Sequence, residues 1–527
     1  MFINGPAGTG KSRIIHAIKD FFDSRGQTRK FRLASYMGIA ARNINGMTLH
    51  QLLCFRNNSS KKNQKILQEL KDLWEGVEYL FIDEVSMIGC KFLYKISETL
   101  SDALGDPQPF GGLSIIFAGD FAQLPPVKTT RLYAHVDTRT REQTTSFQQT
   151  VAGKMLWLSV NIVIQLEHLH RQQGPENVEF QELLSRMREG RCTIADFNLL
   201  NSRIISPSLN IDFSKAPWQH APIIVYDNAT KDLLNIKAAE TFALQTDQQL
   251  HWYYASDFYK KNLIEDDNLI RAFENLHSGE TNQRLTRLPL VLGMPVMISH
   301  NFCVEDGVVN GARGIVKDIR YRIDEHQRRH LVSVIVYIPD SSSTPFSDLP
   351  PHHYPILPDS TEFQMCHPYN HSKLSINRVQ IPLQPAFAMS AHRSQGQTLP
   401  KAKVDFQSCR GTEAPYVMTS RVRFLNDLLI LRPFEHKKIS CRPSEDYRIE
   451  KHRLSLLATL PSENESSLSI DPNDCDLNDH ELLARTQSEI VRSAVDDCQS
   501  PCKNLQNRKR PQLADMVDDN LKKHPKK

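Results

Sequence analysis

The first part of the chain alternates short apolar runs with helical periodicity. The apolar runs are Phe2–Asn4, Arg32–Ser35, Tyr79–Ile82 and Ser114–Ala118, and a helical stretch covers Ser12–Phe22. The runs lack a polar face and end at or just before glycine, aspartate or serine. Such runs are typical of parallel strands buried on both sides. The pattern predicts an α/β domain over residues 1–165, with ligands at the loops that follow its strands.

A second α/β stretch begins near Leu166 and is interrupted. It contains the helical Phe180–Glu189 and the strand-like Ile223–Tyr226, and it resumes over Pro385–Arg432. Between these parts, apolar or alternating runs lie between glycine-containing turns, which predicts a small barrel-like β insertion. Those runs are Pro295–Ile298, Gly314–Val316 and His330–Tyr337.

Two further regions lack a sustained hydrophobic period. Residues 340–375 are rich in Pro, Ser and His, and this composition predicts a long surface loop. Beyond Glu435 the apolar rhythm is lost, and the net charge is −8 over residues 463–497 and +5 over 503–527. We therefore predict a disordered charged tail over 435–527. Its basic runs, Arg508–Pro511 and Lys522–Lys527, are consistent with a nuclear import signal, a DNA-contacting arm or a solvated tail.

Composition narrows the class of protein. The 527 residues are 40% hydrophobic and 24% charged, and this length and balance predict three or four folded domains. The net charge of +4 is too small to indicate nucleic-acid binding by itself, so any such site must be a local patch. The ten cysteines form no C-x-x-C pair, and no apolar run is long enough for a membrane span. Export and membrane partners are therefore disfavoured.

The sequence Gly5-Pro-Ala-Gly-Thr-Gly-Lys-Ser12 matches G-x-x-x-x-G-K-[ST] between a predicted strand and a predicted helix. In this context the glycines let backbone N–H groups face phosphate oxygens, and the helix N-terminus adds partial positive charge. Lys11 is then expected to reach the β- and γ-phosphates of ATP. The motif assigns ATP binding to Gly5, Pro6, Ala7, Gly8, Thr9, Gly10, Lys11 and Ser12.

Two later loops carry polar residues at the ends of predicted strands. Asp83 and Glu84 follow the run Tyr79–Ile82. Mg²⁺ prefers oxygen ligands, so Ser12 and Asp83 are the expected metal ligands, and Glu84 is placed to activate the attacking water. Gln123, in Gly119–Pro126, is expected to touch the γ-phosphate, although a proline-stiffened turn is the alternative interpretation.

Five motifs in this order resemble the Pif family of superfamily 1 DNA helicases (superfamily 1B, RecD-like), and they are also similar to the helicase segments of Helitron-type transposons. They are Gly5–Ser12, Ile82–Met87, Phe110–Gly112, Gly119–Val127 and Ala391–Thr398. The resemblance covers roughly residues 1–434. It implies two RecA-like P-loop NTPase domains with parallel sheets, an SH3-like β-barrel insertion in the second, and ATP in the cleft between them. The implied bounds are 1–165 for the first domain, 166–290 and 381–434 for the two parts of the second, 291–380 for the insertion and its loop, and 435–527 for the tail.

The resemblance also implies roles for individual residues. Arg171 and Arg421 look like the two arginines that reach ATP, Gln123 like the γ-phosphate sensor, and Gly396 like part of the ATP site. Planar guanidinium groups suit phosphate oxygens. Ser35, His50 and His392 resemble positions that contact the DNA backbone.

The sequence departs from the family pattern at three places. Met1 begins at the first strand, whereas the family has an upstream helix and a glutamine-bearing segment that grip adenine, so we expect a fragment or a mis-assigned start. Met37 stands where the family usually has threonine, which weakens an expected DNA contact. Met418-Thr419 replaces the usual Ala-Leu, which is expected to alter packing only.

The function implied by the resemblance is that of an ATP- and Mg²⁺-dependent DNA helicase. It would move 5′ to 3′ on single-stranded and forked DNA and serve repair, recombination, the response to DNA damage or telomere maintenance. The expected address is nuclear, or mitochondrial if an upstream leader exists. Two alternatives stay open, namely a transposon-derived DNA-binding relic without activity, and a DNA-stimulated ATPase that does not unwind.

Overall fold

The computed structural model describes residues 1–55, 64–137, 144–213, 215–369 and 371–459. Its first sheet has six strands in the order β3-β2-β4-β5-β1-β6, and all neighbours are parallel. The strands are β1 (Phe2–Asn4), β2 (Phe31–Ser35), β3 (Met47–Thr48), β4 (Tyr79–Asp83), β5 (Ser114–Gly119) and β6 (Val163–Gln165). The predicted parallel α/β architecture is therefore confirmed.

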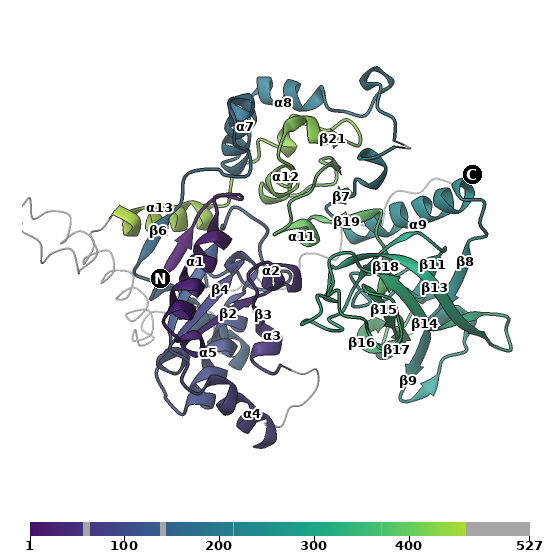
Figure 1. Ribbon diagram of the computed structural model, residues 1–527, viewed down its shortest axis with the longest axis horizontal. Coiled ribbons are helices and arrows are strands. Elements are labelled where there is room, and N and C mark those ends of the chain that lie inside the picture. Colours follow the sequence, from purple (N-terminus) through teal and green to yellow (C-terminus); the bar gives the residue numbers. More distant parts are fainter. Residues whose placement is uncertain (56–63, 138–143, 214, 370, 460–527) are drawn as a thin grey trace, which may run out of the picture. The chain divides into compact units, whose positions relative to one another are not determined.

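Helices lie between these strands along the chain (Figure 1). They are α1 (Lys11–Ser24), α2 (Gly38–Asn43), α3 (Leu49–Leu52), α4 (Gln64–Trp74), α5 (Cys90–Leu104) and α6 (Thr145–Leu158). Threonine hydroxyls cap α3 and α6, since Thr48 accepts from the Gln51 N–H and Thr144 from the Phe147 N–H. The helix α1 starts directly after a loop that follows β1, as the phosphate-loop motif requires.

A second parallel sheet joins segments that are far apart in sequence. Its order is β19-β7-β20-β21, formed by β7 (Ile223–Val225), β19 (Ala388–Ser390), β20 (Ala402–Val404) and β21 (Leu428–Ile430). Its helices are α7 (Val178–Arg188), α8 (Ile194–Asn201), α9 (Asn228–Gln245), α11 (Ala391–Ser394) and α12 (Glu413–Thr419). This confirms the interrupted second α/β stretch. No helix in the described ranges is both long and apolar enough to cross a membrane.

The segment inserted between the two parts of the second α/β domain forms a curved seven-stranded sheet. Its order is β11-β8-β14-β13-β12-β18, with β15 paired to β14. The strands are β8 (His251–Tyr254), β11 (Arg287–Leu290), β12 (Pro295–Ile298), β13 (Arg313–Ile323), β14 (Arg329–Tyr337), β15 (His353–Ile356) and β18 (Leu383–Pro385). The end strands β11 and β18 contact each other, so the sheet nearly closes, as the barrel prediction requires. It takes in β8 and β11, which lie before the predicted start at residue 291.

The prediction of a surface loop over 340–375 is wrong. Besides β15, this region contributes β16 (Asp359–Cys366) and β17 (Lys373–Gln380) to a four-stranded sheet with β9 (Ser256–Tyr259) and β10 (Asn262–Leu263). This sheet and α10 (Asp267–Glu274) enclose a small core of Phe273, Phe363, Leu374 and Ile376. Alternate side chains of β17 are buried, so the period of two was present, but Pro and His residues upstream obscured it.

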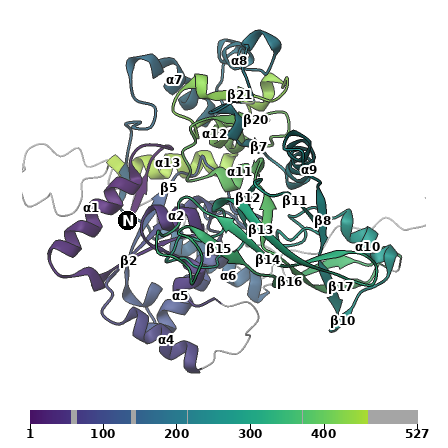
Figure 2. The ribbon, with the colours of Figure 1, turned by 45° about the vertical axis from the view of Figure 1, so that its right-hand side comes forward.

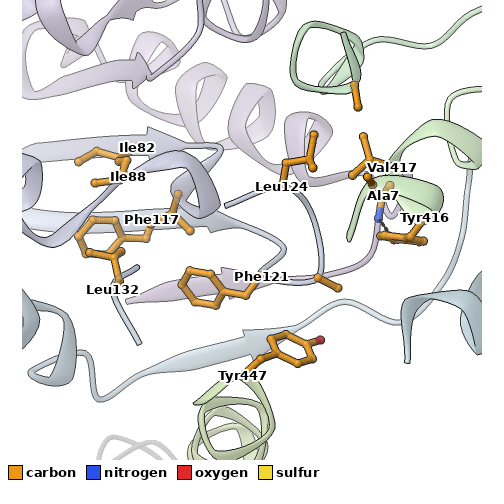
Figure 3. Close-up of a cluster of buried hydrophobic side chains, with 14 of the residues drawn as sticks. Ala7, Ile82, Ile88, Phe117, Phe121, Leu124, Leu132, Tyr416, Val417 and Tyr447 are labelled. Carbon is orange, nitrogen blue, oxygen red and sulfur yellow. Dashed lines mark hydrogen bonds between the residues drawn. The ribbon is translucent and has the colours of Figure 1, made fainter. Parts of the chain in front are cut away.

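The largest buried cluster contains residues of both parallel sheets. Figure 3 shows part of it, with Phe117 and Phe121 of the first sheet's strand β5 and the loop after it, and with Val417 of α12. The Trp157 ring of α6 packs edge-on against Phe2 and Phe121, with ring centroids 5.2 and 5.1 Å apart. Such edge-to-face pairs add to the stabilisation from burial alone.

The predicted tail over 435–527 starts too early. Helix α13 (Glu445–Thr459) packs beside β6 (Figure 1) and is seen from another side in Figure 2, and its Tyr447 ring contacts Tyr133. Its buried positions are Tyr447, Glu450, Leu454 and Leu457, a helical spacing that the surrounding charged residues hide. Residues 460–527, which include both basic runs, lie outside the described residues.

Replacing Glu450 with alanine is expected to destabilise the fold by about 1–3 kcal/mol, because a buried N–H loses its acceptor. The Trp157 indole Nε1 donates to Glu450 Oε1 at 2.8 Å, and both side chains are buried. Chemical denaturation followed by tryptophan fluorescence measures the change. The matched control is Glu445→Ala on the exposed side of the same helix, which is expected to change stability by less than about 0.5 kcal/mol. Equal stabilities for the two variants would contradict this anchoring role.

Candidate active site

The loop between β1 and α1 is shaped by glycines. Gly8 and Gly10 have φ values of +89° and +87°, in the left-handed region that other residues adopt only with strain. A Cβ atom at Gly8 would also lie 2.7 Å from the Arg171 Cβ. The Lys11 ammonium donates to the carbonyls of Gly5 and Pro6 at 2.7 and 2.9 Å. Burial lowers the pKa of Lys11, and nearby carboxylates oppose this shift.

A pocket of about 590 Å³ lies at this loop. It brings together most of the residues assigned to ATP from the sequence, namely Ala7, Gly8, Gly10, Lys11, Ser12, Asp83, Glu84, Gln123, Arg171, Gly396 and Arg421. It is also lined by His170, Gln173, Thr398, Arg423 and Phe424, which sequence reasoning missed. Gly5, Pro6 and Thr9 belong to the loop but do not line the pocket, and the Thr9 hydroxyl donates to the Pro6 carbonyl at 3.0 Å.

Two buried carboxylates, those of Asp83 and Glu84, lie at the C-terminal end of β4. Asp83 Oδ1 accepts the Glu84 N–H at 2.9 Å, and Glu84 has φ +56° and ψ +46°, a left-handed conformation that is uncommon for glutamate. Burial, and then the charge of Glu84, raise the pKa of Asp83. The two buried carboxylates place negative charge close together. With the Ser12 hydroxyl in the same pocket, they offer the hard oxygen ligands that suit Mg²⁺. Within the described ranges, no group of three or more His, Cys, Asp or Glu forms a separate metal site.

Two arginines face the pocket without an acidic partner. Arg171 NH1 donates to the Ser420 carbonyl at 2.8 Å, and Arg421 donates to the Val417 carbonyl at 2.7 Å and to the Ser420 hydroxyl at 2.7 Å. Neither makes an ion pair with a described residue. Burial and the charge of Arg171 lower the pKa of Arg421 to about 9. Two buried cations bound to carbonyls form a site that favours an anion.

A tyrosine from the second sheet's helix α12 reaches the phosphate loop. The Ala7 N–H donates to the Tyr416 hydroxyl at 2.9 Å, drawn as a dashed line in Figure 3, and this hydroxyl donates to Asp120 Oδ2 at 3.2 Å. Asp120 pairs with Arg188 at 2.8 Å. Burial alone would raise the pKa of Asp120, but Arg188 holds it below its usual value. This hydrogen-bond network holds the loop between β1 and α1 from a helix of the second sheet. No local sequence pattern predicts the network.

The three residues predicted to contact DNA lie outside the pocket. Ser35 is fully buried, and its hydroxyl donates to the Asp83 carbonyl at 3.3 Å, so this side chain is not on an accessible surface. His50 is exposed, and its ring stacks on Phe92 at a centroid distance of 4.9 Å. His392 is half-buried beside the Pro125 backbone, and burial lowers the pKa of its imidazole.

Comparisons with known proteins agree with this geometry. Residues 1–197 match the model of the PIF1-like helicase family. The chain is 27% identical over 447 residues to the ATP-dependent DNA helicase PIF1 of Xenopus laevis, which covers 84% of this chain and 60% of the relative. It is 28% identical over 535 residues to the protein of the same name from Emericella nidulans, with 93% and 66% covered. The chain thus spans about three fifths to two thirds of these relatives.

The fold has solved counterparts. The crystal structure of Pif1 helicase from Bacteroides in complex with ADP-AlF3 and ssDNA superposes with a TM-score of 0.61 at 21% sequence identity, and it covers 86% of this chain and 92% of that one. The match supports the arrangement of parallel sheets and inserted barrel described above. With the family model and the relatives, it leads to one conclusion. Residues 1–197 of this chain resemble the PIF1-like helicase family, and the chain is similar to PIF1 helicases over most of its length.

Proposed function

We propose that this chain is an ATP-dependent DNA helicase that moves 5′ to 3′ on single-stranded DNA and unwinds duplexes. Two similar proteins carry the name ATP-dependent DNA helicase PIF1, and the similar Bacteroides structure contains ADP-AlF3 and ssDNA. The similarity to PIF1 helicases supports service in DNA repair, recombination or telomere maintenance, at a nuclear or mitochondrial address. The pocket described above directly supports the part of this proposal that concerns ATP binding and hydrolysis.

The observation that carries the proposal is a pair of arginines that form no ion pair with any residue in the described ranges. Arg171 precedes α7, and Arg421 follows α12 of the second sheet, yet both line one pocket with Lys11 of the first sheet. With Arg423, four basic side chains line a pocket of about 590 Å³, and their charge fits that of a nucleoside triphosphate.

The chemistry assigned to the pocket is phosphoryl transfer to water. Lys11 leaves its loop carbonyls and binds the phosphate oxygens, while Arg171 and Arg421 stabilise the charge that develops on the transferred group. Glu84 orients the attacking water and accepts its proton. Ser12 and Asp83 would hold Mg²⁺, which neutralises phosphate charge when bound. Gln123 contacts the γ-phosphate from the loop after β5.

DNA binding is assigned to the exposed edge beyond the pocket. His50 and Phe92 form a stacked pair that a nucleobase can extend, and Lys95 adds a cation over the neighbouring Phe55 ring at 4.1 Å. Aromatic stacking and phosphate neutralisation give binding that tolerates many sequences and weakens with salt. His392, in α11 of the second sheet, is assigned to DNA binding as well.

The proposal is tested by steady-state ATP hydrolysis with and without single-stranded DNA, at two salt concentrations. Wild-type hydrolysis is expected to rise with DNA and to lose this stimulation at the higher salt. Lys11→Ala is expected to abolish hydrolysis in all four conditions, because the phosphates lose their main cation. Wild-type hydrolysis no greater than that of Lys11→Ala would refute an active motor and leave the DNA-binding relic.

A forked duplex with one labelled strand separates the remaining alternatives. The helicase proposal predicts ATP-dependent strand separation from a fork with a 5′ tail. Hydrolysis stimulated by DNA without strand separation would instead identify an ATPase that moves on or remodels DNA without unwinding it. A duplex with a single 3′ tail is the control for the direction of movement.

A further inference from the structure

The segment that follows α11 contacts the acidic pair from the second sheet. Gln395 Nε2 donates to Glu84 Oε2 at 2.8 Å and to the Ser86 hydroxyl at 3.2 Å. Gln395 is 1% exposed, and 311 residues separate it from Glu84. We propose that Gln395 is a positioning residue, which holds the Glu84 carboxylate in place for the attack of water on ATP.

The orientation of the Gln395 amide supports this role. Its Oε1 atom is buried and has no hydrogen-bond partner among the described residues. A buried acceptor without a partner is unfavourable, so the amide is oriented by what its nitrogen contacts. With the amide reversed, an oxygen would face the Glu84 carboxylate and repel it. The unpaired Oε1 is thus explained by the bond to Glu84.

The neighbouring backbone is fitted to the same carboxylate. Gly396 has φ +76°, and a Cβ atom placed there would lie 3.5 Å from Glu84 Oε1. The Asn43 side chain of α2 donates to the Gly396 carbonyl at 3.3 Å. Gln395 and Gly396 therefore both contact the first sheet's domain, at α2 and at the loop that follows β4.

The conformation of Glu84 explains why its carboxylate needs a hydrogen bond from another segment of the chain to keep its position. Its left-handed φ and ψ are uncommon for glutamate, and its carboxylate is buried beside that of Asp83. Repulsion between two adjacent carboxylates favours their separation. An amide donor is neutral, so it fixes the carboxylate without the ion pair that a lysine or arginine would form.

This inference rests on the proposed hydrolysis of ATP, so wild-type activity is measured first. Gln395→Ala is expected to lower kcat about tenfold or more while the KM for ATP stays within about twofold, since a charge-assisted hydrogen bond is lost from the catalytic base and not from the substrate. Gln395→Met, which keeps the volume and removes the donor, is expected to reproduce the loss and guards against a packing defect.

The decisive measurement is a double-mutant cycle with Glu84→Gln. If Gln395 acts through Glu84, adding Gln395→Ala to Glu84→Gln lowers kcat no further. The matched control is Gln380→Ala in β17, which removes another buried glutamine, one whose side chain bonds to the backbone of Tyr253 and Ile381. Its kcat is expected to equal that of wild type.

Three results would overturn the inference in the presence of wild-type hydrolysis. They are an unchanged kcat in both Gln395 variants, a change confined to KM, or the same tenfold loss in the Glu84→Gln background. If wild type itself does not hydrolyse ATP beyond the Lys11→Ala background, the proposed function fails instead, and the two failures are thereby distinguished. Thermal unfolding of each variant shows whether the fold is intact.

Discussion

Replacing Arg421 with alanine is expected to lower the rate of ATP hydrolysis by about 10³–10⁵-fold, the effect of arginines that act on a transferred phosphoryl group. In the structure the Arg421 guanidinium lies in the pocket and bonds to backbone carbonyls and the Ser420 hydroxyl. Among the described residues no carboxylate forms an ion pair with it, so its charge is available to the phosphates. Single-turnover hydrolysis at saturating ATP measures the change.

The control for this variant is Arg203→Ala. Arg203 also donates to backbone carbonyls, those of Asn426 and Leu428, but it does not line the pocket. Its replacement removes an arginine of the same kind and is expected to leave kcat within about threefold of wild type, because surface and half-buried changes act mainly on stability. A loss in Arg421→Ala no larger than in Arg203→Ala would remove Arg421 from the reaction.

Replacing Glu84 with glutamine is expected to lower kcat by about 10²–10⁴-fold and to leave nucleotide binding intact, because glutamine cannot accept the proton of the attacking water. The amide of the new glutamine keeps an oxygen that can accept the hydrogen bond from Gln395 Nε2. In the wild-type protein this nitrogen lies 2.8 Å from Glu84 Oε2. The substitution therefore removes the chemistry with little change in packing. Binding of a fluorescent ATP analogue and steady-state hydrolysis are measured together.

The matched variant is Glu413→Gln at the start of α12, where Glu413 pairs with Arg131 at 3.2 Å outside the pocket. Normal hydrolysis is expected there. If Glu84→Gln instead weakens nucleotide binding in proportion to its loss of hydrolysis, Glu84 contributes to binding and another group accepts the proton. The two readouts separate these roles without reference to DNA.

The first sheet and its phosphate loop were predictable because their signals are local. A strand buried on both faces is a continuous apolar run, and the loop that follows β1 has a fixed glycine spacing. The resemblance then added Arg171 and Arg421, which no local pattern distinguishes from solvent-facing arginines. Their presence in one pocket with Lys11 agrees with that assignment.

The missed elements share a different property, since their partners are distant in sequence. Tyr416 bonds to the Ala7 N–H across 409 positions, and α13 buries Glu450 against Trp157 across 293. The strands β16 and β17 pair with each other, and β17 also pairs with the remote β9; both were missed because their apolar residues lie among Pro, His and charged residues. Sequence periodicity reports which face is buried, but it does not report what covers that face.

The chain passes between the two parallel sheets twice. It leaves the first sheet after β6 to begin α7, and it returns after β21 to form α13, whose Arg453 donates to the Val160 carbonyl beside β6. Two covalent connections therefore join the second sheet to the first, and the packing of α13 beside β6 makes the second connection a tether that shortens the distance over which the two sheets can separate.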